Sequence, residues 1–388
     1  MFQPIVQFGT SRFLQAHVDL FVSQALAGEA GASHALGGIT VVQTTTRAEG
    51  AARVAALATG APYPVRVRGC QDGARIDQTY YANAIRGALQ ADTQWPQVRQ
   101  AVLHAQVLVS NTGDTGYALD LADGPAMLAS DGAVPASFPA KLLVLLAGRW
   151  QQRPDAPLTL LPCELVQDNG DVLRQLLIRL AQRWALSQTF CVWLQQHCVW
   201  ANSLVDRIVS QALEPVGAVA EPYALWAVQR QVGLVMPCQH PCIVLTDDLA
   251  RYERLKLFLL NAGHTYLAER WHALKRPPRQ TVREAMSDSQ QRGELESFWD
   301  EEVLPVFDLL GQLPQAQAYL ATVRERFENP FLEHHIADIF QNHAQKKQRR
   351  FAPLLALAEQ HGSTLALSRM HAALASAATE PLSGITAN

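Results

Sequence analysis

The spacing of hydrophobic and polar residues changes about halfway along the 388-residue chain. Up to residue 188, short apolar runs alternate with longer segments whose apolar residues recur at helical spacing. The predicted strands are residues 4–8, 38–46, 64–68, 107–110 and 157–161, and the predicted helices are residues 13–26, 95–104, 138–150 and 171–184. Because strands that alternate with helices build a parallel sheet covered on both faces, we predict a doubly wound α/β domain over residues 1–188.

Helical spacing dominates the second half of the chain, where strand candidates become scarce. The predicted helices are residues 189–197, 221–231, 248–271, 293–309, 314–326, 330–344 and 351–360. We therefore predict a second, mostly α-helical domain over residues 189–388.

The first predicted strand ends at Gly9, and a helix is predicted to begin four residues later at Phe13. A strand, a glycine turn and a helix form the first unit of a Rossmann-type dinucleotide-binding domain, in which the helix N-terminus faces the pyrophosphate. Only one glycine remains where the G-x-G-x-x-G fingerprint has three, so the pattern alone is a weak signal. Gly9, Arg12 and Phe13 are the candidate cofactor contacts here.

The end of the second predicted strand bears on the choice between NAD and NADP. An NAD-binding domain usually has Asp or Glu there to bind the ribose 2′-hydroxyl. This chain has Gln43, Thr44, Thr45 and Thr46 instead, followed by Arg47. Arg47 either binds a 2′-phosphate or faces solvent. We predict NAD, with Thr45 as a contact, and NADP stays open.

Polar residues also follow two later strands. Asn111 and Thr112 come directly after residues 107–110, and Glu164 follows residues 157–161. The carboxyl ends of parallel strands form the ligand-binding edge of an open α/β sheet. Asn111 and Thr112 are therefore candidate cofactor contacts and Glu164 is a candidate substrate contact, although ordinary turns favour the same residue types.

Residues 252–267, YERLKLFLLNAGHTYL, form an apolar helical segment interrupted by Lys256, Asn261 and His264. In an α-helix Asn261 lies about 140° and His264 about 80° round from Lys256, so the three share a broad sector. A buried lysine needs a partner or a lowered pKa, and a lysine of lowered pKa suits a general base. In the alternative interpretation, Lys256 reaches the surface and His264 caps the helix.

Three further groups have both a structural and a chemical interpretation. Asp206 and Arg207 follow a small polar turn and suit a local ion pair better than a ligand contact. The Cys238-x-His240-x-Cys242 spacing is too tight for a structural zinc knuckle, so we expect no metal. The basic cluster of Lys346, Lys347, Arg349 and Arg350 is either a solvated helix face or a socket for a sugar acid, with Lys346 and Arg350 as the carboxylate contacts.

Composition narrows the class of protein. A content of 48% hydrophobic and 17% charged residues is that of a globular protein, and a net charge of −3 argues against nucleic acid as a partner. No apolar run approaches the ~20 residues that span a bilayer, and residues 1–10 lack the features of a signal peptide. The six cysteines contain no C-x-x-C pair and are expected to be reduced. We expect a cytoplasmic protein without membrane partners, either a monomer or a small homo-oligomer.

Several motifs, in order, resemble the mannitol dehydrogenase family of long-chain polyol dehydrogenases. They are FGTSRFLQAH (8–17), SLVDRIV (203–209), KLFLLNAGH (256–264), RFENPFLEHHIADI (326–339) and KKQRRFAP (346–353). VSNTGDTGY (109–117), SFPAKLL (137–143), LPCELVQDNGD (161–171) and EPYALW (221–226) most resemble the tagaturonate reductase (altronate oxidoreductase) branch. Mannitol-type members have an asparagine where this chain has Leu165, which puts a mechanism with two oxyanion asparagines in doubt.

The resemblance implies hydride transfer between NAD(P) and a sugar acid or polyol without a metal. It implies Lys256 as general acid and base, Asn261 as a donor to the developing oxyanion, and His264 as a ligand of substrate hydroxyls. Tagaturonate and altronate are the leading pair, and a polyol or fructuronate/mannonate enzyme is the alternative. A non-catalytic dinucleotide-binding regulator is the alternative from a different class.

Overall fold

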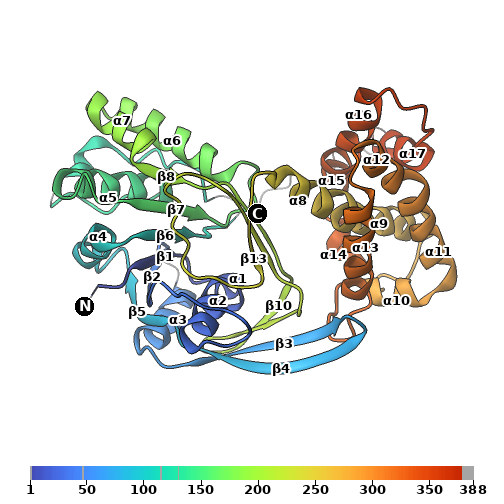
Figure 1. Cartoon of the computed structure of the whole chain (residues 1–388), viewed down its shortest axis with the longest axis horizontal. Helices are drawn as coiled ribbons and strands as arrows, with labels where there is room; N and C mark the ends of the chain where they lie inside the picture. Colours follow the sequence, from blue (N-terminus) through green and yellow to red (C-terminus); the bar gives the residue numbers. More distant parts are fainter. Residues whose placement is uncertain (1, 46–47, 114–115, 130, 378–388) are drawn as a thin grey trace. The chain divides into compact units, whose positions relative to one another are not determined.

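The computed structural model describes residues 2–45, 48–113, 116–129 and 131–377, so Arg47 and residues 114 and 115 lie outside the described residues. The chain forms two compact units, each described here by itself. The first contains residues 1–67 and 77–249, and the second contains residues 68–76 and 250–388. The first unit is α/β and the second is built mainly of helices, as the sequence predicts (Figure 1).

A six-stranded sheet forms the centre of the first unit, in the order β5-β2-β1-β6-β7-β8, and all of its strands are parallel. Its strands are β1 (Ile5–Phe8), β2 (Ile39–Gln43), β5 (Ile85–Gln90), β6 (Val107–Ser110), β7 (Leu158–Pro162) and β8 (Cys198–Trp200). Every residue of β1, β6 and β7 is buried, which explains their continuous apolar runs. The strand order reverses between β1 and β6, and such a switch point opens a crevice at the carboxyl ends of the strands.

Helices cover both faces of this sheet. They are α1 (Arg12–Ala16), α2 (Val18–Ala27), α3 (Ala48–Ala58), α4 (Trp95–His104), α5 (Phe138–Gln152), α6 (Asn169–Arg183) and α7 (Gln188–Gln196), with a short 3₁₀ helix, η1 (Pro125–Leu128). Apolar side chains of α4, α5, α6 and α7 share one core with β6 and β7, and these helices form a layer along the sheet in Figure 1. Local signals set the helix starts: Ser137 caps α5, and Pro139 occupies its first turn.

Residues 197–249 contain strands where the sequence predicted helix, and the prediction of a helix over residues 221–231 is wrong. This part of the chain forms β9 (Ser203–Asp206), β10 (Val209–Ala212), β11 (Ala218–Ala220), β12 (Leu225–Gln229) and β13 (Ile243–Thr246). Strand β12 pairs with β9 on one side and β13 on the other, so its apolar residues are buried by neighbours distant in sequence. The first unit therefore continues to Leu249, whereas the sequence placed the boundary after residue 188.

Two long strands, β3 (Tyr63–Gln71) and β4 (Ala74–Ala82), complete a four-stranded sheet in the order β10-β11-β3-β4. The tip of this β3–β4 hairpin, residues 68–76, belongs to the second unit. Glu325 accepts hydrogen bonds from the backbone N–H groups of Asp72 (3.2 Å) and Gly73 (2.7 Å). The guanidinium of Arg68 lies over the ring of Phe331, with its Cζ atom 3.9 Å from the ring centre. A segment from the first quarter of the chain is thus built into the helical unit.

The helices of the second unit surround a core of their own. They are α8 (Leu249–Leu255), η2 (Lys256–Asn261), α9 (Ala262–Ala273), α10 (Val282–Ser287), α11 (Ser289–Phe298), η3 (Trp299–Val303), α12 (Leu304–Leu309), α13 (Leu313–Phe327), α14 (Ile336–Phe340), α15 (His343–Arg350), α16 (Ala352–Gln360) and α17 (Ser368–Ala377). The helix predicted over residues 330–344 is only partly correct, because residues 330–335 form a loop. Both η2 and η3 are π-helical, a conformation that the sequence gave no sign of.

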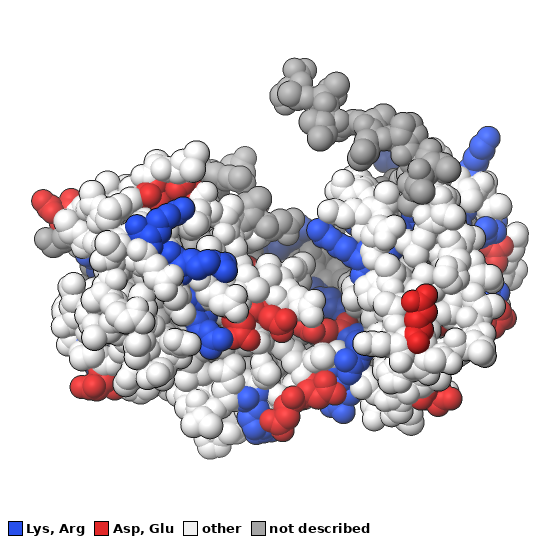
Figure 2. Space-filling view, turned by 90° about the horizontal axis from the view of Figure 1, so that it is seen from above, with Lys and Arg blue, Asp and Glu red and all other residues white. Residues whose placement is uncertain are grey.

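The surface carries charges of both signs. On the face shown in Figure 2, Lys and Arg side chains are interspersed with Asp and Glu, in keeping with a net charge of −3. Among the described residues drawn there, no continuous basic stripe of the kind that binds nucleic acid is visible. Within the described ranges, every helix is too short or too polar to cross a membrane.

Candidate active site

The carboxyl ends of β1 and β6 approach each other closely at Gly9. Gly9 has a φ of +120°, and a Cβ atom there would lie 2.5 Å from the carbonyl oxygen of Asn111. Ser11, which caps α1, also donates to Asn111 Oδ1 at 3.1 Å, and Asn111 Nδ2 donates to the carbonyl of Cys163 at 2.8 Å. The one glycine retained from the fingerprint is therefore required by local packing. The ends of β1, β6 and β7 are held together at the crevice of the sheet.

Glu164 is a buried structural group in this arrangement. Its carboxylate accepts hydrogen bonds from the Ser110 hydroxyl (2.9 Å), from the backbone N–H and hydroxyl of Thr112 (both 3.0 Å) and from the Tyr117 hydroxyl (3.3 Å). Burial raises its pKa, and the hydrogen bonds from Ser110 and Thr112 oppose that shift. Both oxygens of Glu164 accept hydrogen bonds from the loop after β6, and its predicted contact with the substrate stays a prediction.

The other predicted cofactor contacts lie near the same edge. Arg12 is exposed at the start of α1, and Phe13 is partly exposed and stacks on His17 with ring centres 4.8 Å apart. Thr45 is exposed after β2, where its carbonyl accepts a hydrogen bond from Gln43 Nε2 at 2.8 Å. The structure thus places polar and aromatic groups around the crevice at the end of β1.

Asp206 and Arg207 are both buried. Arg207 donates to the carbonyl of Ala16, the last residue of α1, and through Nε to the carbonyl of Glu221 at 3.0 Å. Burial lowers the pKa of Arg207 to about 10, so it still carries its charge at neutral pH. These contacts agree with an anchoring role for Arg207, and the predicted local ion pair between Asp206 and Arg207 stays a prediction.

The segment that carries Lys256, Asn261 and His264 has a different twist from the one that the sequence suggested. Residues Lys256–Asn261 are π-helical, and the N–H of Ala262 bonds to the carbonyl of Leu257, five residues earlier. Residues i and i+5 are neighbours along the axis of a π-helix, whereas in an α-helix they are about 140° apart. Lys256 and Asn261 are therefore brought to the same side of the helix.

Trp299 supports this segment from the second π-helix. Its Nε1 donates to the carbonyl of Leu259 at 3.2 Å, and its ring packs against Gly263, where a Cβ atom would lie 2.7 Å from Cζ2. In a π-helical turn the backbone N–H groups are shifted from the positions that they have in an α-helix. A hydrogen bond from the Trp299 indole to the Leu259 carbonyl therefore stabilises the turn. Gly263 is needed because a side chain there would displace the indole.

His264 lies inside α9 and does not cap it, because the cap position is Asn261. Its ring stacks on Phe327 with centres 4.2 Å apart and meets His334 edge-on at 4.8 Å. Burial lowers the pKa of His264 well below its usual value, and the charges of His334, Arg350, Arg326 and Lys346 lower it further. A neutral imidazole that can both donate and accept is the form expected at neutral pH.

The four basic residues at positions 346, 347, 349 and 350 of α15 lie in three different environments. Arg350 Nη1 donates to the carbonyl of Asn261 at 3.0 Å and to the hydroxyl of Thr265 at 2.7 Å, and Lys346 Nζ donates to the carbonyl of Ile339 at 2.7 Å. Lys347 is buried elsewhere, and Arg349 is exposed. Of the predicted socket, Arg350 directly contacts the segment that carries Lys256, Asn261 and His264, and Lys346 acts electrostatically on His264.

Sequence reasoning assigned no role to three members of this group. His334 and Arg326 both lie close enough to His264 to lower its pKa. They belong to the motif RFENPFLEHHIADI, so the resemblance pointed to their segment without giving their place. Thr265 was also missed, although it lies one helical turn after Asn261 and shares Arg350 with it.

The Cys238-x-His240-x-Cys242 loop has its histidine committed to hydrogen bonds. His240 Nε2 lies 2.9 Å from Gln24 Oε1, and its Nδ1 accepts from the N–H of Cys242 at 3.0 Å. Within the described part of the chain, no three His, Cys, Asp or Glu side chains are grouped so as to hold a metal ion.

The sequence resembles named proteins along most of its length. It is 29% identical over 371 residues to an altronate oxidoreductase of Halalkalibacterium halodurans, a match that covers 90% of this chain and 69% of the relative. It is 31% identical over 277 residues to an altronate oxidoreductase of Escherichia coli, with 66% of this chain and 55% of the relative covered. The chain thus spans about half of that second relative.

Solved structures share the fold. A substrate-free D-sorbitol dehydrogenase superposes with a TM-score of 0.79 at 19% identity, covering 97% of this chain and 80% of the other. Mannitol 2-dehydrogenase of Pseudomonas fluorescens, solved as a ternary complex with NAD and D-mannitol, gives 0.72 at 18% identity and covers 97% and 79%.

Two family domains account for almost the whole chain. The Mannitol dehydrogenase Rossmann domain matches residues 3–235, and the Mannitol dehydrogenase C-terminal domain matches residues 248–378. The gap between the two matches falls beside the division at Leu249 that the structure itself shows. The chain belongs to the mannitol dehydrogenase family.

Proposed function

We propose that this protein is a dinucleotide-dependent oxidoreductase that interconverts a keto sugar acid and the corresponding hydroxy acid, of the tagaturonate and altronate type. Membership of the mannitol dehydrogenase family supports the reaction class, and the relatives named altronate oxidoreductase support the substrate class. NAD is the expected cofactor, because the structural relative was solved with NAD. NADP remains the alternative, because no carboxylate follows β2 in residues 43–47.

The first unit fits a dinucleotide. Its sheet has the switch point that such ligands use, and Gly9, Asn111 and Thr112 lie at the two strand ends that border it. Arg12 is exposed beside this crevice and would attract the pyrophosphate. When bound, the nicotinamide supplies the hydride chemistry, accepting hydride from the carbinol carbon in oxidation and returning it in reduction.

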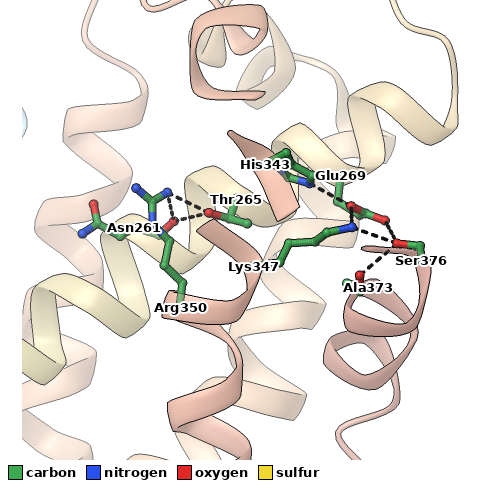
Figure 3. A network of polar contacts seen from close by, with 8 residues as sticks. All are labelled: Asn261, Thr265, Glu269, His343, Lys347, Arg350, Ala373 and Ser376. Carbon is green, nitrogen blue, oxygen red and sulfur yellow. Dashed lines mark hydrogen bonds and ion pairs between the residues drawn. The ribbon is translucent and has the colours of Figure 1, made fainter. Parts of the chain in front are cut away.

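Residues of the second unit would transfer the proton of the substrate hydroxyl. In oxidation Lys256 Nζ takes the hydroxyl proton of the substrate, and in reduction it gives a proton to the alkoxide oxygen. The Asn261 side chain donates a hydrogen bond to that oxygen, and a donor of this kind is worth about 3 kcal/mol at the transition state. In Figure 3 this amide points away from Arg350, which binds the backbone carbonyl of Asn261 instead. Neutral His264 orients a neighbouring hydroxyl.

The observation that carries the choice of a sugar acid is the positive charge around His264. Burial lowers its pKa most, and His334, Arg350, Arg326 and Lys346 lower it further. Burial lowers the pKa of Arg350 to about 10, and the neighbouring Arg349 adds to this shift, but Arg350 stays charged at neutral pH. A concentration of buried and partly buried cations favours an anionic ligand, and a carboxylate on the sugar meets that requirement.

The test is to follow the oxidation of NADH and NADPH with tagaturonate, fructuronate and fructose in parallel. Activity confined to the two uronates is expected. Activity on fructose alone would refute the sugar acid and leave a polyol dehydrogenase on the same fold. Absence of turnover with all three, together with tight dinucleotide binding, would favour the regulator.

A further inference from the structure

A row of polar contacts joins α9 to α15 beyond the catalytic residues (Figure 3). On one side Asn261, Thr265 and Glu269 follow one another at intervals of four residues, which places them on one face of the helix. On the facing helix the contacts come from residues 343, 347 and 350, spaced by four and three. We call these six residues the polar seam. Its two ends are Arg350 at Asn261 and His343 at Glu269, so the helices run in opposite directions.

The end of the seam away from Asn261 is an ion pair between the buried Lys347 and Glu269, whose side chain is 18% exposed. Lys347 is 1% exposed, and its ammonium lies 2.9 Å from Glu269 Oε2. His343 Nε2 lies 2.8 Å from the same oxygen, and the Ser376 hydroxyl of α17 donates to Glu269 Oε1 at 2.9 Å. Burial raises the pKa of Glu269, but hydrogen bonds from His343, Lys347 and Ser376 outweigh it and leave a pKa of about 2. Glu269 is therefore ionised and strongly held.

An ion pair of this kind tolerates few alternative positions. If α15 slid or turned relative to α9, the ammonium of the buried Lys347 would lose Glu269, and an unpaired charge inside the protein is very unfavourable. Buried polar groups are known to specify the register of packed helices. Arg350 is three residues after Lys347, so the register that satisfies Lys347 also sets where the Arg350 guanidinium lies.

We propose that the Glu269–Lys347 pair is a positioning device for substrate recognition. It holds α15 in the register in which Arg350 reaches the carbonyl of Asn261 and Lys346 stands near His264. Lys347 and Glu269 do not touch substrate. They act through Arg350 and Lys346, so they set the affinity for the sugar carboxylate rather than the chemistry at the carbinol. The expected effect on KM rests on the proposed function, whereas the expected effect on the position of Arg350 does not.

The alternative is that the pair only stabilises the fold. Removing a purely stabilising contact lowers the fraction of folded enzyme, which reduces the apparent kcat and the thermal midpoint and leaves KM unchanged. Removing a positioning contact raises KM for the anionic substrate in enzyme that remains folded. KM for the dinucleotide, which binds the other unit, stays constant in both cases.

The kinetic test compares Lys347→Met with Arg349→Met, since both remove one positive charge from α15 but Arg349 is exposed. Lys347→Met is expected to raise KM for the hexuronate at least about tenfold, whereas a surface charge such as Arg349 changes it less than about twofold. Lys347→Arg keeps the charge and should recover part of the loss. Equal KM values for Lys347→Met and Arg349→Met would overturn the proposal. If Lys347→Met does not fold, Glu269→Gln and Ser376→Ala replace it in the same comparison.

The structural test needs no substrate. Crystal structures of the wild type and of Lys347→Met, or of Glu269→Gln if that variant alone folds, give the distance from Arg350 Nη1 to the Asn261 carbonyl, which is 3.0 Å in the intact seam. We expect this contact to be lost in the variant, and its retention would overturn the proposal. A wild type that reduces none of the three sugars would refute the proposed function instead, and the two crystal structures would then decide the inference alone.

Discussion

Replacing Gly263 by alanine tests whether the π-helical segment depends on the packing of Trp299. A Cβ atom at this position would lie 2.7 Å from Trp299 Cζ2 and 3.1 Å from its Nε1. The indole is fully buried and cannot withdraw without opening the core. If it moves, its hydrogen bond to the carbonyl of Leu259 lengthens or breaks. The substitution therefore strains the turn between Lys256 and Asn261.

The sign of the effect follows from opposing magnitudes. Alanine in place of glycine inside a helix stabilises by about 1 kcal/mol. Overpacking a buried site costs about 1–3 kcal/mol, and leaving a buried donor without its acceptor costs about 1–3 kcal/mol more. The free energy of unfolding should thus fall by about 1–5 kcal/mol in Gly263→Ala. Because Leu259 lies between Lys256 and Asn261, for which we propose catalytic roles, kcat should fall as well.

Gly293→Ala is the matched control, because Gly293 is an exposed helical glycine with no atom within 4 Å of an added Cβ. It should stabilise the protein by about 0.5–1 kcal/mol. Urea unfolding followed by circular dichroism gives the midpoints of both variants and the wild type. The argument is refuted if Gly263→Ala matches or exceeds the stability of Gly293→Ala.

Three further predictions concern charge. Lys256→Ala should lower kcat by about 10²–10⁴-fold while dinucleotide affinity, measured by fluorescence titration, stays the same; unchanged turnover would remove Lys256 from the mechanism. Arg350→Met should raise KM for a hexuronate by about 10–100-fold with little change for a neutral sugar, since a hydrogen bond to a charged group is worth about 1.5–3 kcal/mol. Burial raises the pKa of Asp19 to about 7, although its hydrogen bond with Tyr63 opposes the shift. The folded state thus keeps a proton that the unfolded state loses near pH 4, and wild-type stability should fall between about pH 4 and 7 by up to about 4 kcal/mol relative to Asp19→Asn. If the free energy of unfolding changed with pH in the same way in the wild type and in Asp19→Asn, the raised pKa of Asp19 would be contradicted.

The parts of the fold that sequence could predict are those in which local pattern and burial agree. The strand over residues 107–110 and the helix over residues 95–104 have the predicted bounds, because an all-buried parallel strand and a one-sided helix each leave a clear pattern. The helix predicted over residues 221–231 failed because Trp226 and Val228 are buried by β9 and β13. Their apolar spacing fits a helix equally well, and the pairing partners are not visible locally.

The candidate site, like the fold, could be predicted from the sequence only in part. Lys256, Asn261 and His264 were recognised from their spacing and from the resemblance, and their catalytic roles remain predictions. Their arrangement was not predictable, because a π-turn depends on tertiary partners such as Trp299 rather than on helix propensity. The Glu269–Lys347 pair joins residues 78 positions apart, and neither residue stands out in its own segment.

The β3–β4 hairpin has a consequence for the order in which the chain folds. Its tip binds Glu325, which is synthesised about 250 residues after Asp72 and Gly73. During translation β3 and β4 can pair with each other early, but the tip must wait for α13 and the loop that contains Phe331. Completion of the helical unit is therefore tied to a segment made long before it. A fragment that starts at residue 250 would lack nine residues of its own compact unit.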